Sequence, residues 1–195
     1  MRGWLIVLSL LAVAGLADAG AAQQPHTSQY AGEENRRIKS LSADDIDELR
    51  RGGGWGLAKA AELNGVPGPA HLLELKDDIA LSAAQVERIA AMMDDMRRRA
   101  IVVGERLIEL EGELEDHFRQ RTITDAVLKS LLDQIASERG RLRYVHLSTH
   151  LQTPLILTEE QIARYNRLRG YGVAACDVVP EGHDAALWRK HNDCG

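Results

Sequence analysis

Leu81-Ser82-Ala83-Ala84-Gln85 begins the stretch LSAAQVERIAAMMDDMRRRAIVVGERLIELEGELEDHF (residues 81–118), which decides the fold of this chain. Its apolar side chains recur at alternating steps of three and four residues, as the side chains along one face of a helix do. This stripe predicts one long helix to about residue 120, interrupted only by Gly104 and Gly112. Its members are Val86, Ile89, Met93, Met96, Ala100, Val103, Leu107, Leu110, Leu114 and Phe118.

A second stripe with helical spacing follows and predicts another long helix that continues to about Leu151. Its members are Leu128, Leu132, Ile135, Leu142 and Val145. The connection over residues 120–124 is short, so the two helices should pack antiparallel as a hairpin. Almost no segment alternates as a strand does, and we therefore expect an all-α fold. Short flanking helices are predicted over residues 42–51, 56–63 and 70–80, and after Thr158.

A hairpin with one apolar stripe on each helix cannot cover its own apolar surface completely. The short flanking helices can bury part of that surface, and a second copy of the hairpin can bury the rest. We therefore expect a homodimer.

Two copies of the pattern Leu-Ser/Thr-x-x-Gln mark the starts of helices. They consist of Leu81, Ser82 and Gln85 in the first copy and of Leu157, Thr158 and Gln161 in the second. The hydroxyl group can accept a hydrogen bond from a backbone N–H of the first turn, and the glutamine can reach back to the N–H of the cap. A relaxed third copy lies upstream at Leu41–Ile46.

The N-terminal residues have the build of a secretory signal peptide. A short apolar run follows Met1-Arg2, and Ala17-Asp18-Ala19 is a small-x-small cleavage site. We interpret residues 1–19 as the signal peptide and expect no integral membrane segment after its cleavage; an uncleaved first helix is the alternative. We interpret the remaining parts as a flexible leader over residues 20–40, a helical domain over residues 41–170 and a C-terminal tail over residues 171–195.

Composition and motifs argue against two broad classes of function. With 24 Lys and Arg against 29 Asp and Glu, the net charge is -5, and no basic face or aromatic platform suggests nucleic-acid binding. Arg97-Arg98-Arg99 lies among Asp94, Asp95 and Glu105, a pattern typical of a solvated, ion-paired helix face. The sequence contains no Gly-x-Ser-x-Gly elbow, no His-Glu-x-x-His motif and no isolated reactive cysteine, so we predict that the chain is not an enzyme.

The paired motifs, the export signal and the helix layout together resemble the Spy/CpxP family of periplasmic proteins, whose hallmark is a paired Leu-Thr-x-x-Gln motif. Leu157–Gln161 matches this motif, and Leu81–Gln85 has Ser in place of Thr, which preserves the capping chemistry. The resemblance covers about residues 70–170. It implies a four-helix, cradle-shaped dimer in the periplasm that binds unfolded polypeptides, tunes an envelope-stress sensor or binds divalent metal ions.

The first function that follows is an ATP-independent periplasmic chaperone or stress-response adaptor, which requires no cofactor and binds partly unfolded proteins on a concave face. Met and long charged side chains suit such a face because they adapt to many partners. The side chains that we expect there are Met92, Met93, Met96, Arg97, Leu107 and Leu114. The alternative is a periplasmic heavy-metal sensor coupled to a membrane-bound regulator.

His146 and His150 form the pair most typical of a metal site, because a spacing of four places both imidazoles on one helix face. They would bind Zn²⁺, Ni²⁺, Co²⁺ or Cu²⁺ together with ligands from elsewhere in the chain or from a dimer partner. The alternative is that both histidines are hydrogen-bonded polar residues at an interface. Candidates for further ligands are His71, Glu74 and His117. A helical wheel places the pair on the side of Leu128, Leu132 and Leu142.

Cys176 and Cys194 are the only cysteines and lie in the C-terminal tail. In an exported protein, an even pair predicts a disulfide, which would close a loop of about 19 residues. A zinc site that also uses His183 and His191 is the alternative, although this spacing matches no standard zinc module. We expect Trp188 to form a small hydrophobic plug in this loop, and an interaction site is the alternative. A purely structural interaction protein that uses the disulfide-closed tail is a third possible function.

Overall fold

The computed structural model describes residues 28–171, 179 and 182–191, and every regular element among them is helical. The chain forms two units, one up to Glu34 and one from Asn35 onward. In the described part of the first unit, the backbone N–H of Gly32 donates to the carboxylate of Glu34, and a 3₁₀ turn, η1 (Glu33–Asn35), begins there. The helices that follow belong to the second unit and confirm the predicted all-α fold.

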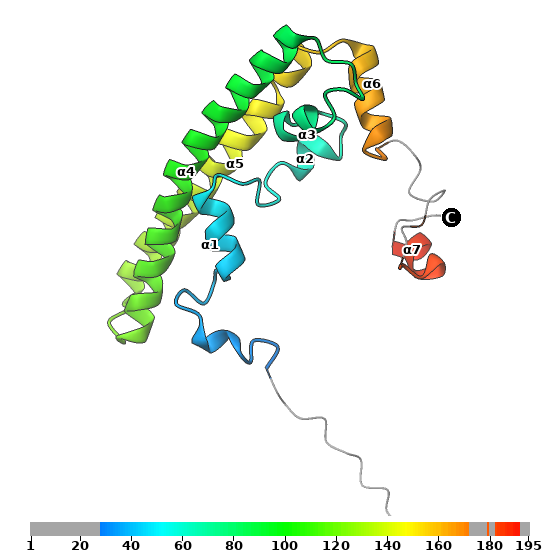
Figure 1. The fold of residues 1–195 in the computed structure, drawn as a ribbon. Helices are drawn as coiled ribbons and strands as arrows, with labels where there is room; N and C mark the ends of the chain where they lie inside the picture. Colours follow the sequence, from blue (N-terminus) through cyan, green and yellow to red (C-terminus); the bar gives the residue numbers. More distant parts are fainter. Residues whose placement is uncertain (1–27, 172–178, 180–181, 192–195) are drawn as a thin grey trace, which may run out of the picture. The chain divides into compact units, whose positions relative to one another are not determined.

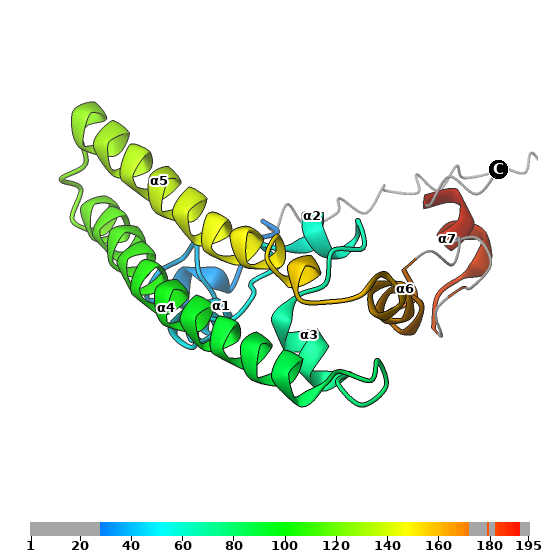
Figure 2. The same cartoon turned by 90° about the horizontal axis from the view of Figure 1, so that it is seen from above.

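The two longest helices, α4 (Ala83–Arg119) and α5 (Asp125–His150), form the predicted antiparallel hairpin. They run side by side over most of their length (Figure 1, Figure 2). With 37 residues, α4 is about 55 Å long at 1.5 Å per residue. Ser82 and Thr124 cap the starts of the two helices, and Arg121 adopts a left-handed φ of 57° in the connection between them.

The apolar stripe of α4 faces the core as predicted over most of its length, but the stripe of α5 does not begin where the sequence suggested. Leu131 is 5% exposed, whereas Leu132 is 47% exposed. The prediction for Leu132 is therefore wrong, because neighbouring helix positions differ by about 100° and both leucines fit a periodic pattern. The buried face of α5 contains Leu131, Ile135, Leu142, Val145, His146, Thr149 and His150.

Three short helices, α1 (Ala43–Arg50), α2 (Lys59–Glu62) and α3 (Pro69–Glu74), lie on one side of the hairpin (Figure 1). The last two are shorter than predicted, and the segment after α3 ends at Ala80, whose φ of 53° is incompatible with a continuing helix. The C-terminal end of α1 packs closely on α4 at Gly104. A Cβ atom there would lie 2.8 Å from the Leu49 carbonyl oxygen, which explains why this position lacks a side chain.

The second unit begins at Asn35, before the predicted domain boundary at residue 41. Ile38, which we expected in a flexible leader, is buried in the same core as Leu41 and Leu49. The Nζ atom of Lys39 lies 2.6 Å from a carboxylate oxygen of Glu115 in α4. A single apolar residue in a polar segment has no periodicity, and the sequence pattern therefore contains no signal for this contact.

The two Leu-Ser/Thr-x-x-Gln motifs cap α4 and α6 (Glu159–Leu168), each as a complete capping box. They also pair with each other. The amide nitrogen of Gln85 donates to the side-chain oxygen of Gln161 at 2.8 Å, and the amide nitrogen of Gln161 donates back at 3.1 Å. Each glutamine also donates to the carbonyl that precedes the other motif, Ile156 for Gln85 and Ala80 for Gln161.

A second, smaller core lies beneath this pair of motifs. Leu72, Ile79, Ile89 and Tyr165 are buried there, and Leu81 and Leu157 pack against them. The chain passes from α5 to α6 through η2 (Thr153–Leu155), where the Thr153 hydroxyl donates to the Pro67 carbonyl at 2.6 Å. The paired motifs therefore join the start of α4, the segment after α3 and α6 at one end of the hairpin.

Several predictions fall on the ends of the chain. The signal peptide, residues 20–27 of the leader and both cysteines of the predicted disulfide, Cys176 and Cys194, lie outside the described residues. The tail contains a helix that was not predicted, α7 (Ala185–His191), and the rings of His183 and Trp188 meet edge to face at 5.0 Å. Within the described residues, no helix combines the length and the apolar character needed to cross a bilayer.

Candidate functional site

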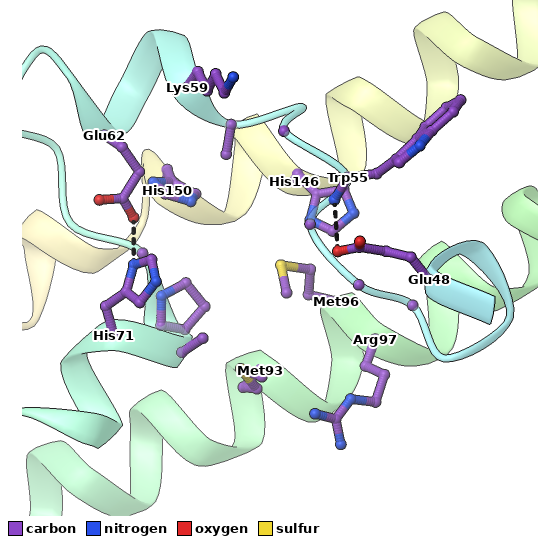
Figure 3. Close-up of a pocket in the computed structure, with 18 of the residues that line it drawn as sticks. Glu48, Trp55, Lys59, Glu62, His71, Met93, Met96, Arg97, His146 and His150 are labelled. Carbon is purple, nitrogen blue, oxygen red and sulfur yellow. Dashed lines mark hydrogen bonds and ion pairs between the residues drawn. The ribbon is translucent and has the colours of Figure 1, made fainter. Parts of the chain in front are cut away.

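A cavity of about 1160 Å³ opens between the short helices and the hairpin (Figure 3). We call it the histidine cavity. The loop that follows α1, the helices α2 and α3, and parts of α4 and α5 form its walls. Figure 3 shows its lining side chains arranged around an open centre, with His146 and His150 on α5 and Met93, Met96 and Arg97 on α4. The other side chains that define it are Glu48, Trp55, Lys59, Glu62 and His71.

His146 is the most deeply buried titratable side chain of this cavity, at 2% exposure. Its Nε2 atom is buried and has no hydrogen-bond partner among the described residues. Burial, followed by the proximity of His150, lowers the pKa of His146 below its ordinary value of 6.5, although Glu48 acts in the opposite direction. His146 is therefore a neutral imidazole at neutral pH with one unused ring nitrogen.

His150 is oriented by the backbone of the segment between α2 and α3. Its Nδ1 lies 3.0 Å from the carbonyl oxygen of Val66. Because a carbonyl only accepts, we assign a proton to Nδ1 of His150. Gly68 leaves room for this ring, since a Cβ atom there would lie 2.6 Å from His150 Cε1 and 2.7 Å from a carboxylate oxygen of Glu62.

Glu62 is the anionic centre beside His150 and His71 in the cavity wall (Figure 3). One carboxylate oxygen lies 3.1 Å from Nδ1 of His71, and the other accepts from the hydroxyls of Tyr165 at 2.7 Å and Tyr171 at 3.3 Å. Burial by itself raises the pKa of Glu62, but the hydrogen bonds from Tyr165 and His71 outweigh it and lower the pKa. Burial also raises the pKa of Tyr165, and its hydrogen bond to Glu62 adds to this effect.

The structure brings together most of the side chains predicted for a metal site. His71 and Glu74 line the same cavity as His146 and His150, whereas His117 lies near the far end of α4, with its Nδ1 2.9 Å from the Thr122 hydroxyl. In the part of the chain that the structure describes, no three His, Cys, Asp or Glu side chains are arranged so that they could hold one metal ion. A metal bound at His146 and His150 would need further ligands from elsewhere.

The six side chains predicted for a client-binding face do not form one surface. Met93, Met96 and Arg97 line the histidine cavity. Leu107 is fully buried in the core of the hairpin, and Leu114 is partly buried against that core. Met92 is only partly exposed. The prediction of an open face is therefore wrong for Leu107, because a periodic stripe on a long helix marks the core as readily as a binding surface.

Two long cationic side chains border the histidine cavity without partners. Lys59 in α2 and Arg97 in α4 are exposed, and neither forms an ion pair or hydrogen bond with another described residue. The other carboxylates of the lining are Glu48 and Glu74. Glu48 accepts from the backbone N–H of Trp55 at 3.1 Å and lies 3.7 Å from a guanidinium nitrogen of Arg51. The unpaired charges of the cavity are thus mainly positive.

A second groove, of about 760 Å³, is lined only by residues of α4 and α5. We call it the α4–α5 groove. Val102 and Tyr144 line it and are 70% and 68% exposed. Asp95 pairs with Arg98 at 3.2 Å and with Arg99 at 3.4 Å, and Arg141 pairs with Glu138 at 2.8 Å. The groove therefore combines exposed apolar side chains with charges of both signs.

Sequence reasoning missed several side chains that shape these sites. Trp55 is fixed by its indole N–H, which donates to Asp45 at 2.8 Å, and by the guanidinium of Arg139, 4.8 Å from the ring centre. Glu62 was missed as well, since a lone glutamate in a four-residue helix carries no pattern. No protein family, curated protein or solved structure matches the chain, and the function is therefore argued from this geometry.

Proposed function

We propose that this chain is an exported, ATP-independent chaperone or envelope-stress adaptor that binds partly unfolded polypeptides in the periplasm. The observation that carries the proposal is the α4–α5 groove, where Val102 and Tyr144 are largely exposed on a long hairpin. Exposed apolar side chains that gather in a groove mark a surface for partners. The proposal moves the client-binding face from the predicted residues around Leu107 to this groove.

The charges around the groove favour weak, exchangeable contacts with many sequences. The ion pairs of Arg98 and Arg99 with Asp95 are exposed, and exposed pairs contribute only about 0–1 kcal/mol each. A client can therefore replace them with its own charges at little cost. Tyr144 offers apolar area together with a hydroxyl group, which suits segments of mixed composition. Binding of this kind should weaken as the salt concentration rises.

The paired capping motifs support the same proposal through the resemblance to the Spy/CpxP family. The mutual hydrogen bonds of Gln85 and Gln161 give these motifs a structural role beyond capping, which fits a family defined by the pair. The same resemblance favours a homodimer, and a second copy of the chain is the competing occupant of the groove. Sedimentation of the protein in the assay buffer shows whether the chain forms such a dimer.

The test is the aggregation of a chemically denatured enzyme, followed by light scattering with and without the purified protein. We expect suppression by the natural chain and a several-fold weaker effect of the variant Val102→Ser/Tyr144→Ser. Leu155→Ser is the matched control, because Leu155 is also strongly exposed but lies in η2, outside the groove. The absence of suppression by the natural chain at several-fold molar excess would exclude the proposed function.

A heavy-metal sensor coupled to a membrane-bound regulator is the second candidate function. The observation that favours it is the orientation of His150 by the Val66 carbonyl, since metal-binding histidines commonly donate their other ring N–H in this way. Titration calorimetry with Zn²⁺, Ni²⁺, Co²⁺ and Cu²⁺ tests it. Binding should disappear in His146→Ala/His150→Ala and persist in the control His117→Ala, which changes a histidine outside the cavity. Unchanged binding by the double variant would exclude this site.

A further inference from the structure

We infer that the histidine cavity binds a small amphipathic carboxylate, a molecule with one carboxylate head and an apolar body. The inference goes beyond the proposed function, because the residues that line the cavity are different from those that line the α4–α5 groove. The cavity wall contains three features: an apolar lining, a buried imidazole nitrogen without a partner among the described residues, and two exposed cations that no described carboxylate neutralises.

The apolar lining suits the body of such a ligand. Met93 and Met96 of α4 and the ring of Trp55 contribute to the wall, and the cavity volume of about 1160 Å³ is large enough to hold a small molecule. Methionine side chains adapt to ligands of irregular shape. Trp55 is held in place by Asp45 and Arg139, and this part of the wall is therefore formed before a ligand arrives.

The charges of the lining favour a single negative charge on the ligand. Lys59 and Arg97 are exposed cations that no described carboxylate neutralises, and they come from two different helices. Glu62 and Glu48 are already engaged by hydrogen bonds within the walls, whereas Glu74 is exposed and adds a negative charge at the surface. A monoanion can pair with Lys59 or with Arg97, whereas a dianion such as a phosphate ester meets more repulsion from these glutamates.

The unused nitrogen of His146 supplies the polar contact inside the cavity. Buried polar atoms in folded proteins almost always have a hydrogen-bond partner, and an exception calls for an explanation. Nε2 of His146 is such an exception, and its ring lines the cavity beside Met96 (Figure 3). An oxygen atom of a bound carboxylate can accept a hydrogen bond from this ring while a cation neutralises the charge.

The test is titration calorimetry of the full mature chain with dodecanoate, well below its critical micelle concentration and with EDTA present to exclude metal ions. We expect saturable binding of one dodecanoate per chain. Acetate has the head without the body, and dodecyltrimethylammonium has the same body with a cationic head; neither should saturate the site. Equal binding of dodecyltrimethylammonium would show a nonspecific apolar surface and overturn the inference.

Two variants and one spectroscopic signal locate the site. Lys59→Gln/Arg97→Gln should weaken dodecanoate binding at least tenfold, whereas Arg143→Gln removes an exposed cation outside the cavity and should leave it unchanged. Dodecanoate should shift the imidazole NMR signals of His146 but not those of His117, which lies outside the cavity. Equal affinities of the natural chain and the double variant, or an unshifted His146 signal, would overturn the inference.

The chaperone proposal and this inference can be refuted independently of each other. Val102→Ser/Tyr144→Ser should bind dodecanoate as the natural chain does, because both residues lie in the α4–α5 groove. A denatured client that displaces dodecanoate from the natural chain would show that the cavity serves polypeptides, and would overturn the inference without affecting the chaperone activity.

Discussion

The two sides of the α4–α5 hairpin carry similar apolar side chains but use them differently. On the covered side, the short helices pack on Leu107 and Gly104 and enclose the histidine cavity. On the open side, Val102 and Tyr144 remain largely exposed between charged residues. One long amphipathic hairpin can therefore provide both a core and a binding surface. The side on which the short helices pack becomes the core, and the other side stays exposed.

Adjacent positions show how sharply the two sides are separated. Val103 and Val145 are buried, although each directly follows one of the exposed residues Val102 and Tyr144. One step along a helix rotates the side chain by about 100°, which is enough to move it from the core to solvent. The chemistry of a valine or leucine therefore does not reveal its environment, and substitutions on the two sides should differ greatly in effect.

The largest effect is expected from Leu107→Ala on the covered side. Removal of this fully buried side chain leaves a cavity, and the free energy of unfolding should fall by about 2–5 kcal/mol. The matched change Leu132→Ala, in the half-exposed leucine of α5, should cost less than about 0.5 kcal/mol. Urea denaturation followed by circular dichroism measures both values. Equal costs would mean that a second copy of the chain buries Leu132 in solution.

Gly104→Ala should have the next largest effect. The new Cβ atom would lie 2.8 Å from the Leu49 carbonyl oxygen, and the shift of α1 needed to relieve this clash should cost about 1–3 kcal/mol. Gly140→Ala is the control, because nothing lies within 4 Å of its Cβ position in α5. It should instead stabilise the protein by about 0.5–1 kcal/mol through helix propensity. Thermal unfolding measures both variants. Melting temperatures that shift in the same direction for the two variants would contradict this contrast.

Substitutions of the paired glutamines test how the two capping motifs hold one end of the hairpin together. Gln85→Ala and Gln161→Ala should each cost about 1–2 kcal/mol, because each removes a cap contact and donors to the other motif. The cost of the double variant should be smaller than the sum of the two single costs by about 0.5 kcal/mol or more, since the two side chains share hydrogen bonds. Gln134→Ala, whose side chain bonds only within α5, is the control for a single helix. Strict additivity would show that the motifs act separately.

The smallest effect concerns the pH dependence of stability and His146. Its pKa in the folded chain is lowered from 6.5, and the unfolded chain therefore binds a proton more readily. The contribution of the neutral imidazole to the free energy of unfolding is fully present above pH 6.5 and is lost as the pH falls below this value. His146→Gln should flatten this slope in denaturation curves. Both proteins should still lose stability below pH 4.5, where the lowered pKa of Glu62 takes effect. An unchanged slope near pH 6 in the variant would contradict the assignment.

The helices and their caps could be predicted because they depend on neighbours in the chain. The stripe of α4 and the capping boxes at Ser82 and Thr158 involve residues three or four positions apart. The start of the stripe in α5 was predicted wrongly, since local spacing allows either Leu131 or Leu132 to face the core. Ile38 was missed because a lone apolar residue forms no local pattern.

The sequence by itself determined that this chain folds as a helical hairpin with capped helices, because hydrophobic periodicity and capping act over one or two turns. Only the tertiary structure decided that Gln85 meets Gln161 and that His71 and Glu62 share a cavity with His146 and His150. Such contacts join residues from separate helices, and their geometry follows from how the helices pack. Packing depends on the shape of the whole core, which no short stretch of sequence contains.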